Sequence, residues 1–202
     1  MSTNSTEYGA AVMPGGPALS SPSEPPLALR PLQVEPLNAS TFLPYGQVMA
    51  ESEDGVSFGP DDARLVLDRG TPRFYVMRLD HRPWETTGLT RHRQVTQCLA
   101  SVGGTPWCLV VAPPSLGPTD TPALTEIRAF RIPGNVAIML NLGTWHAGPY
   151  FSGATASFFN LELADTNVVD HDNVSLIATC GAGLSFASGT DPEALSCPPP
   201  AG

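Results

Sequence analysis

The chain has 202 residues, of which 42% are hydrophobic, so it is long enough for one sizeable core. Its formal net charge is −9 and its basic residues are scattered, which excludes a nucleic-acid partner because phosphate binding needs clustered cations. All 10 basic residues are arginines, so neither Schiff-base chemistry nor a P-loop lysine is available. No segment is apolar over the length of a membrane span, and no membrane partner is expected.

The two ends of the chain differ in composition from its middle. Residues 1–28 are rich in Ser, Pro, Gly and Ala and predict a disordered N-terminal tail, while residues 179–202 predict a loose C-terminal tail. A single domain is expected between them, over residues 29–178. The N-terminal tail lacks the apolar run of a secretory signal, which favours a cytoplasmic location, and organellar targeting by this tail stays an open alternative. The cysteines share no CxxC spacing and are expected to be reduced thiols: Cys98, Cys108, Cys180 and Cys197.

In chain order, the middle of the sequence contains short apolar segments separated by turn residues. Residues 51–64 are acidic and rich in Gly, Pro and Asp, which predicts a loop. Residues 107–112 form a fully apolar run bounded by prolines, which predicts a strand. Short strands at a spacing of about 8–12 residues, with no long amphipathic helix, predict an antiparallel sandwich or barrel. Further strands are expected within residues 29–37, 47–50, 73–79, 86–100, 127–132, 136–140 and 156–163.

Two segments that carry histidine are candidates for a site. The apolar run 136–140 predicts a strand, and His146 follows it in a stretch that contains two glycines. The polar stretch 90–97 contains His92 and leads into another apolar run. We hypothesise that the two segments face each other across one pocket. The alternative for His146 is a core histidine hydrogen-bonded to the backbone.

These segments resemble the two motif halves of the cupin barrels. The first half, G-x5-H-x-H-x3-4-E-x6-G, is similar to Thr90-x-His92-x4-Gln97-x6-Gly104. The second half, G-x5-P-x-G-x2-H-x3-N, is similar to Gly134-x6-Asn141-x-Gly143-x2-His146. The resemblance implies an all-β, cupin-like double-stranded β-helix, also called a jelly-roll barrel, in a single domain with flexible termini.

The cupin resemblance also implies a weaker metal site than the family pattern provides. A full cupin site offers three His and one Glu, whereas this chain offers His92, His146 and the neutral amide of Gln97 at the corresponding places. These three side chains are the tentative ligands of a weakly bound divalent metal.

A closer resemblance is to the ureidoglycolate lyase family, which is itself cupin-like. It covers roughly residues 36 to 175, and its strength lies in the order and spacing of the matching segments. Bacterial members look as though they carry a His-Glu pair where this chain has Thr87 and Gly88, and the sequence looks like a plant or algal branch. The matching segments are residues 42–48, 89–92, 96–97, 107–112, 127–130, 145–146 and 158–162.

The resemblance implies cleavage of ureidoglycolate into glyoxylate and urea, in allantoin and purine catabolism. His92 and His146 would serve as base and acid or as metal ligands, and Glu162 would be a catalytic carboxylate. Asn160 and Glu162 share one strand face, although the alternative for Glu162 is an exposed strand charge. The remaining candidates would bind the substrate: Arg91 its carboxylate, and Gln97, Asn141, Trp145 and Asn160 its other groups.

Two other functions stay open at this point. One is a metal-dependent cupin of different activity, such as an oxygenase or isomerase. The other is a non-catalytic cupin that binds a small carboxylate, which the missing His-Glu pair favours. In each case the expected partner is a small-molecule carboxylate, and the exposed edge strands of such a barrel predict a homodimer.

Overall fold

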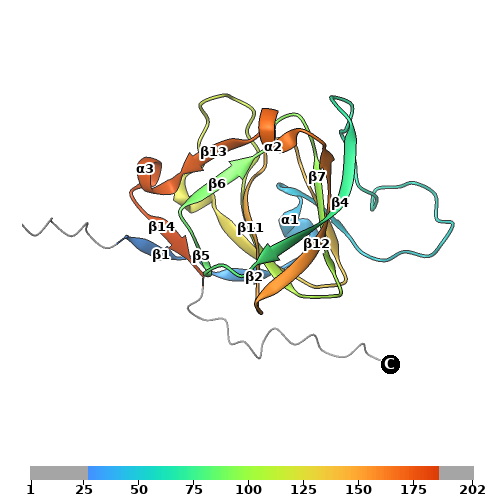
Figure 1. Ribbon diagram of the computed structural model, residues 1–202, viewed down its shortest axis with the longest axis horizontal. Coiled ribbons are helices and arrows are strands. Elements are labelled where there is room, and N and C mark those ends of the chain that lie inside the picture. The colour runs from blue at the N-terminus through green and yellow to red at the C-terminus, as the bar shows by residue number, and fades with distance from the viewer. Residues whose placement is uncertain (1–26, 187–202) are drawn as a thin grey trace, which may run out of the picture.

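Short strands are the main regular elements of residues 27–186, the part of the chain that this computed structural model describes (Figure 1). The expected all-β, cupin-like fold is confirmed. The strands are β1 (Leu29–Pro31), β2 (Val34–Pro36), β3 (Gly46–Met49), β4 (Pro72–Asp80), β5 (Glu85–Thr86), β6 (Gly88–Arg91), β7 (Gln97–Val102), β8 (Trp107–Ala112), β9 (Arg128–Ile132), β10 (Ala137–Leu140), β11 (Trp145–Phe151), β12 (Thr155–Leu163), β13 (Asp172–Ser175) and β14 (Gly183–Ser185). The helical turns are α1 (Ala39–Phe42), a 3-10 turn (Leu124–Glu126), α2 (Thr166–Val169) and α3 (Leu176–Cys180).

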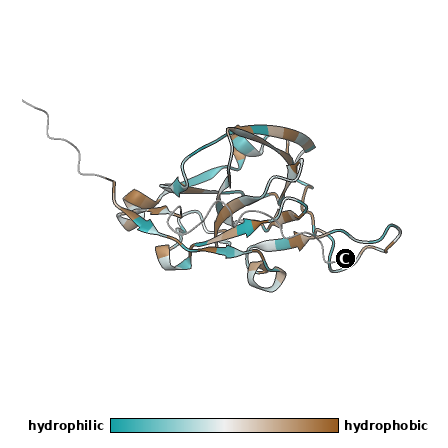
Figure 2. Ribbon diagram, turned by 90° about the horizontal axis from the view of Figure 1, so that it is seen from below, coloured by the Kyte–Doolittle hydropathy of each residue, from teal (hydrophilic) through white to brown (hydrophobic). Residues whose placement is uncertain are grey.

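Two large sheets form the body of the barrel. The first has the order β3-β10-β7-β12-β4 and the second has the order β13-β6-β11-β8-β9-β2. Strand pairs within them are antiparallel, as the sequence predicts, except that β2 runs parallel to β9. Figure 2 shows hydrophobic residues interspersed with hydrophilic ones along the strands, as expected for sheets with one face toward a core.

The apolar strand β8 lies between two hydrophobic clusters, which explains why every one of its residues is buried. Because side chains alternate along a strand, Trp107, Leu109 and Val111 enter the cluster between the two large sheets. Cys108, Val110 and Ala112 point the other way, into a second cluster that α3 and β14 help to cover. This second cluster includes Leu89, Trp145, Leu176, Leu184 and Phe186.

The C-terminal boundary of the domain lies later in the chain than the sequence predicts. Residues 183–185 form β14, which pairs in parallel with β1 and antiparallel with β5. Leu184 and Phe186 are buried in the second cluster, so a loose tail from residue 179 is wrong for residues 179–186. The surrounding Gly, Ser and Ala residues conceal this strand in the sequence. The rest of both predicted tails, residues 1–26 and 187–202, lies outside the described residues.

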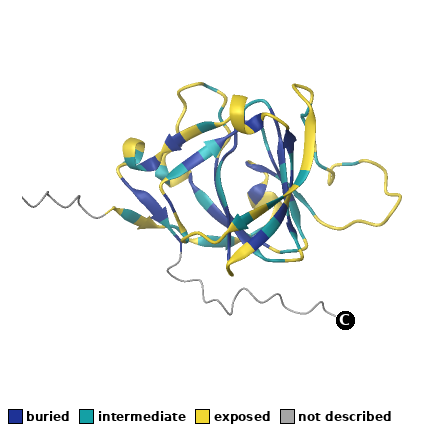
Figure 3. Cartoon of the chain, viewed as in Figure 1, coloured by how far each residue is buried: buried dark blue, intermediate teal, exposed yellow. Residues whose placement is uncertain are grey.

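A long loop joins β3 to β4 and projects from the barrel with most of its residues exposed, as Figure 3 shows. It contains the acidic segment predicted as a loop. No helix within residues 27–186 is long and apolar enough to cross a membrane.

Candidate active site

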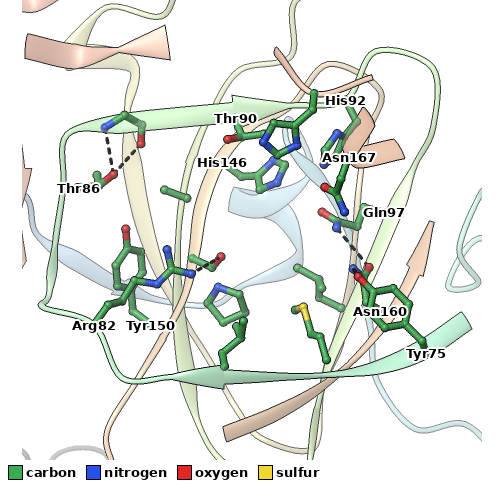
Figure 4. A pocket seen from close by; sticks show the side chains of 18 residues that line it. Tyr75, Arg82, Thr86, Thr90, His92, Gln97, His146, Tyr150, Asn160 and Asn167 are labelled. Atoms are coloured by element: carbon green, nitrogen blue, oxygen red, sulfur yellow. Dashed lines mark hydrogen bonds between the residues drawn. The ribbon is translucent and has the colours of Figure 1, made fainter. Parts of the chain in front are cut away.

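A cavity of about 280 Å³ opens between the two large sheets, and both candidate histidines line it (Figure 4). The ring centroids of His92 and His146 lie 5.3 Å apart. His146 comes from β11 and pairs with Thr90 of β6, while His92 follows the last residue of β6. The backbone N–H of Gly143 donates to the carbonyl of His92 at 2.6 Å, which ties the two segments together. The hypothesis that they face each other across one pocket is therefore confirmed.

Both imidazole rings are oriented by backbone carbonyls. Nδ1 of His92 lies 2.5 Å from the carbonyl oxygen of Asp170, and Nδ1 of His146 lies 3.1 Å from that of Thr144. A carbonyl oxygen can only accept, so Nδ1 carries the proton in each neutral ring and Nε2 is left with a free lone pair. His146 therefore makes the backbone hydrogen bond expected for a core histidine, and its ring also lines the cavity.

The electrostatics of the cavity keep both rings neutral. Burial, with repulsion from His92 as a smaller cause, lowers the pKa of His146 from 6.5 to about 3. Burial also lowers the pKa of His92, which outweighs the opposing effect of its bond to Asp170. Two neutral imidazoles therefore offer free Nε2 atoms at neutral pH.

These lowered pKa values predict acid-sensitive stability. The folded-state pKa of His146 is below its unfolded value, so the unfolded chain binds more protons as pH falls from 6.5 toward 3. Stability is fully present above pH 6.5 and is lost below it, at up to about 1.4 kcal/mol per pH unit for each such group. We expect His146→Gln to flatten this dependence in denaturant unfolding at pH 7, 5 and 4 with a chelator present. An unchanged slope would contradict the lowered pKa.

Asp170 and His171 belong to this part of the site, although the sequence favours a solvated loop over a polar cluster for residues 170–172. The Asp170 carboxylate accepts the backbone N–H groups of Arg93 and Gln94, at 2.8 Å and 2.7 Å. It thereby fixes the segment that carries His92. The ring of His171 lines the cavity with its centroid 5.5 Å from that of His92.

The other end of the cavity is lined by amides and a phenol. Gln97 on β7, Asn160 on β12 and Tyr75 on β4 meet there. Gln97 Nε2 donates to Asn160 Oδ1 at 3.2 Å, and Asn160 Nδ2 donates to the Tyr75 hydroxyl oxygen at 3.0 Å. Gln97 and Asn160 thus occupy the place predicted for them. Tyr75 was missed, although it lies opposite Asn160 in the β4–β12 register.

Glu162 lies behind these groups and does not line the cavity. It is 1% exposed, which excludes the exposed strand charge considered as the alternative. It accepts from Tyr75 and Gln97 at 3.1 Å and 3.2 Å, and more distantly from Asn167 at 3.4 Å. Asn160 and Glu162 do share one buried strand face, as predicted. Without access to the cavity, however, Glu162 does not reach a substrate as a catalytic carboxylate.

Arg91 does not line this cavity, so the predicted contact with a substrate bound there has no support in the structure. Thr90 lines the cavity, and the neighbouring Arg91 points to the other side of the sheet because side chains alternate along β6. Its guanidinium donates to the Ser115 carbonyl and hydroxyl at 2.7 Å and 2.6 Å, to the Gly117 carbonyl at 2.6 Å, and to Asp172 at 3.1 Å.

Trp145 and Asn141 also lie away from the cavity, contrary to the substrate-binding roles predicted for them. The Trp145 ring stacks under the Arg91 guanidinium at 4.3 Å, and its Nε1 donates to the Ser115 hydroxyl at 3.0 Å. Asn141 contributes main-chain bonds to the turn before β11: its N–H donates to Tyr45, and its carbonyl accepts from Thr144. Both residues support the site from outside.

Arg82 is the arginine that lines the cavity, and no sequence pattern marked it. One of its Nη atoms donates to the carbonyl of Gly148 at 3.1 Å, and its guanidinium lies 5.0 Å from the Tyr150 ring centroid. The register of β11 against β8 shifts between Ala147 and Tyr150, and this irregularity places the Gly148 carbonyl where Arg82 can reach it. Figure 4 shows Arg82 and Gln97 on opposite sides of the cavity, with the two histidines together at the top of the view.

The backbone at Gly88 lines the cavity without a side chain. A Cβ there would lie 2.8 Å from the carbonyl oxygen of Val174 on β13. A larger residue at position 88 would therefore require β13 to shift.

The metal-binding capacity of the cavity is limited to neutral donors. Within residues 27–186, no group of three or more His, Cys, Asp or Glu side chains is arranged to hold a metal ion. The predicted ligands that line the cavity are the Nε2 atoms of His92 and His146 and the oxygen Oε1 of Gln97, which has no hydrogen-bond partner among residues 27–186; the His171 ring lies beside His92. Two imidazoles and an amide fit weak binding of a divalent cation at most.

A cupin-like barrel with a paired-histidine cavity is thus the class that the fold and the site define. A sequence model of the family described as "Ureidoglycolate lyase" matches residues 29–179. The chain belongs to the ureidoglycolate lyase family.

Curated relatives with the same description occur in several bacteria. The chain is 28% identical to the "Ureidoglycolate lyase" of Azotobacter vinelandii over 130 residues, which cover 58% of this chain and 76% of the relative. It is 28% identical to that of Pseudomonas entomophila over 137 residues, which cover 58% and 75%. For Pseudomonas fluorescens strain Pf0-1 the identity is 29% over 137 residues, with the same two coverages.

Proposed function

We propose that this protein is a carbon–nitrogen lyase that cleaves ureidoglycolate into glyoxylate and urea, a step in the breakdown of allantoin and purines. Membership of the ureidoglycolate lyase family supports the reaction. The observation that carries the proposal is the pair of neutral imidazoles, each with a free Nε2, on one small cavity.

The reaction moves one proton from oxygen to nitrogen. The substrate carries a hydroxyl, a carboxylate and a ureido nitrogen on the same carbon. The hydroxyl loses its proton as its electrons form the aldehyde C=O of glyoxylate. The bond between this carbon and nitrogen breaks, and its electron pair goes to the nitrogen, which takes a proton and leaves as urea. No water is consumed, so a base and an acid at one end of the cavity are sufficient.

The two histidines suit both proton transfers. A base must be unprotonated, and the lowered pKa values of His92 and His146 keep Nε2 free at neutral pH. Once protonated, a ring with such a low pKa is a strong acid, which favours return of the proton to the departing nitrogen. We assign the base to His146, which comes from strand β11 and lines the cavity.

The substrate carboxylate requires a cation, and Arg82 takes the place that the sequence analysis gave to Arg91. Its guanidinium keeps further N–H groups free after its bond to Gly148, and a guanidinium binds a carboxylate through two parallel N–H···O bonds. Its partial solvent access suits a group that meets the charged end of an incoming substrate.

Arg82→Gln is expected to raise KM for ureidoglycolate by about tenfold to a hundredfold, the loss of one charge-assisted contact, with a smaller change in kcat. Steady-state rates of glyoxylate release measure both constants. Arg69→Gln is a control, since Arg69 is exposed on the long loop between β3 and β4 and does not line the cavity. Equal KM values for the two variants would contradict the role of Arg82.

The proposed reaction is tested by its products. Purified protein given ureidoglycolate should release glyoxylate and urea in equal amounts. Release of ammonia in place of urea, or no release of glyoxylate, would overturn the proposal. In the second case a non-catalytic carboxylate binder would be favoured, and calorimetry with glyoxylate would test it.

A divalent metal on His92, His146 and Gln97 remains a second proposal, and with it a metal-dependent activity such as an oxygenase or isomerase. It is supported by the two free Nε2 atoms and the unpartnered Gln97 Oε1. The weak donor set predicts a metal that dialysis against a chelator removes. Elemental analysis that finds stoichiometric metal after such dialysis would favour this activity over the lyase.

We also propose that the protein is a homodimer that pairs through β4. This strand is an edge of its sheet, and its outer face exposes Phe74 and Val76 by 67% and 55%. Phe74 stacks on the exposed Phe159 of β12, with centroids 5.5 Å apart. A second copy would cover both the apolar face and the unpaired edge. Sedimentation of a monomer at micromolar concentration, unchanged by Phe74→Ser, would contradict this proposal.

A cytoplasmic location is the accompanying proposal, supported by the state of the cysteines. Cys98, Cys108 and Cys180 are free thiols. Burial raises the pKa of Cys98 to about 11 and that of Cys108 to about 12, so neither is a reactive thiolate. Imaging of a fluorescent fusion that found the protein inside an organelle would contradict this location and favour targeting by the N-terminal residues.

A further inference from the structure

The side-chain oxygen of Gln97 is buried without a hydrogen-bond partner among the described residues. Gln97 is one of the residues that line the cavity, and Figure 4 shows its amide nitrogen turned toward Asn160 and its oxygen on the cavity side. Leaving a buried acceptor unpaired is unfavourable, because the atom gives up its hydrogen bonds to water and gains none in return. This atom is therefore prepared for a donor that the protein itself does not supply.

The orientation of this amide follows from the Glu162 carboxylate. A carboxylate only accepts, so the Tyr75 hydroxyl donates its single proton to Glu162 Oε1. The phenol oxygen must then accept from Asn160 Nδ2, which leaves Asn160 Oδ1 as an acceptor. Gln97 Nε2 supplies this acceptor with one proton and Glu162 Oε2 with the other.

The donor and the acceptor in each of these hydrogen bonds are thereby assigned. Rotating the Gln97 amide by half a turn would place its oxygen against the oxygens of Asn160 and Glu162. Glu162 thus prevents the rotation and keeps Gln97 Oε1 toward the cavity.

We infer that Gln97 Oε1 accepts a hydrogen bond from the N–H groups of the ureido end of the substrate, and that Glu162 is a positioning residue that maintains this polarity. The inference rests on the proposed function. The ureido group is the part of ureidoglycolate that carries N–H donors, whereas the carboxylate end carries none. Arg82 and Gln97 lie on opposite sides of the cavity and the two histidines lie together at its edge, so a substrate with its carboxylate at Arg82 would extend its ureido end toward Gln97 (Figure 4). The amide oxygen therefore selects a ureido leaving group.

The binding of urea and the binding of glyoxylate, measured separately, test the two ends of the cavity. Binding of urea and of glyoxylate is measured by calorimetry or by product inhibition for the wild type and for Glu162→Gln. A glutamine at position 162 can donate to Gln97 Oε1, so the Gln97 amide can turn its NH2 toward the cavity. We expect urea binding to weaken about tenfold, the loss of one hydrogen bond, while glyoxylate binding stays within about twofold. Arg82→Gln should show the opposite pattern.

A second variant, Gln97→Met, keeps the volume of the side chain and removes the acceptor, in case Glu162→Gln does not fold. It should also weaken urea selectively. Equal weakening of both products in the folded variants, or unchanged urea binding, would overturn the inference. The inference would also be overturned if urea binding required a divalent cation and were abolished by a chelator, because Gln97 Oε1 would then be a metal ligand. Failure of the lyase proposal has a different signature: the wild-type protein would bind urea through Gln97 but would release no glyoxylate from ureidoglycolate.

Discussion

His146→Gln is expected to lower kcat for ureidoglycolate by about a thousandfold, within the range for loss of a general base. Glutamine has a similar volume and can still bond the Thr144 carbonyl, but it has no group that takes up and returns a proton at neutral pH. The structural basis is the free Nε2 of His146, which faces the cavity while Nδ1 is held by the backbone at 3.1 Å. Glyoxylate release at saturating substrate measures the effect, and circular dichroism checks the fold.

His81 provides a matched control for this experiment. Its Nδ1 also bonds a backbone carbonyl, that of Phe151, at 3.0 Å. It does not line the cavity, however. His81→Gln should therefore keep wild-type kcat. A His146→Gln protein that folds and turns over at the wild-type rate would show that the base lies elsewhere, with His92 as the next residue to replace.

Arg91→Leu is expected to destabilise the protein by about 3–5 kcal/mol, the cost of breaking a buried ionic network by removing one partner. Arg91 is 1% exposed, and its replacement leaves the carbonyls of Ser115 and Gly117 without their guanidinium donor, while Asp172 keeps only its ion pair with Arg93 at 2.7 Å. For a domain of this size the midpoint of thermal unfolding should fall by about 10 °C or more.

An exposed arginine gives the comparison for Arg91. Arg78 pairs with Asp80 at 3.9 Å on the surface, so Arg78→Leu should change stability by less than about 1 kcal/mol. If Arg91→Leu kept full stability and instead raised KM, the original assignment of Arg91 to the substrate carboxylate would be restored.

The sequence predicted the strands and the pairing of histidines for clear physical reasons. The run at 107–112 is apolar at every position because β8 is covered on both faces. The His92 and His146 segments were located because each adjoins an apolar strand and fits one half of the cupin pattern. The β14 strand was hidden because residues 181–185 are small and polar apart from Leu184.

The direction of individual side chains was less predictable. Arg91 and His92 are adjacent in sequence, and only the pleat of β6 decides which of them enters the cavity. Arg82 lies in a turn after β4, where no periodic pattern applies, and its place depends on the irregularity in β11. The sequence alone did not predict the burial of Glu162, because this burial follows from the register of β12 against β4 and β7.

Backbone carbonyl groups set the orientation of the His92 and His146 rings. The oxygens of Thr144 and Asp170 that hold them belong to groups found at every amino acid, so exchanging the side chain at position 144 or 170 leaves the ring's anchor in place. A mutational scan should accordingly find the imidazoles irreplaceable, while substitutions at position 170 act through the lost carboxylate bonds to the N–H groups of residues 93–94 and leave the carbonyl that holds the ring. Proton transfer by the two histidines can then be retained in such a barrel while the other residues that line the cavity change to fit other leaving groups.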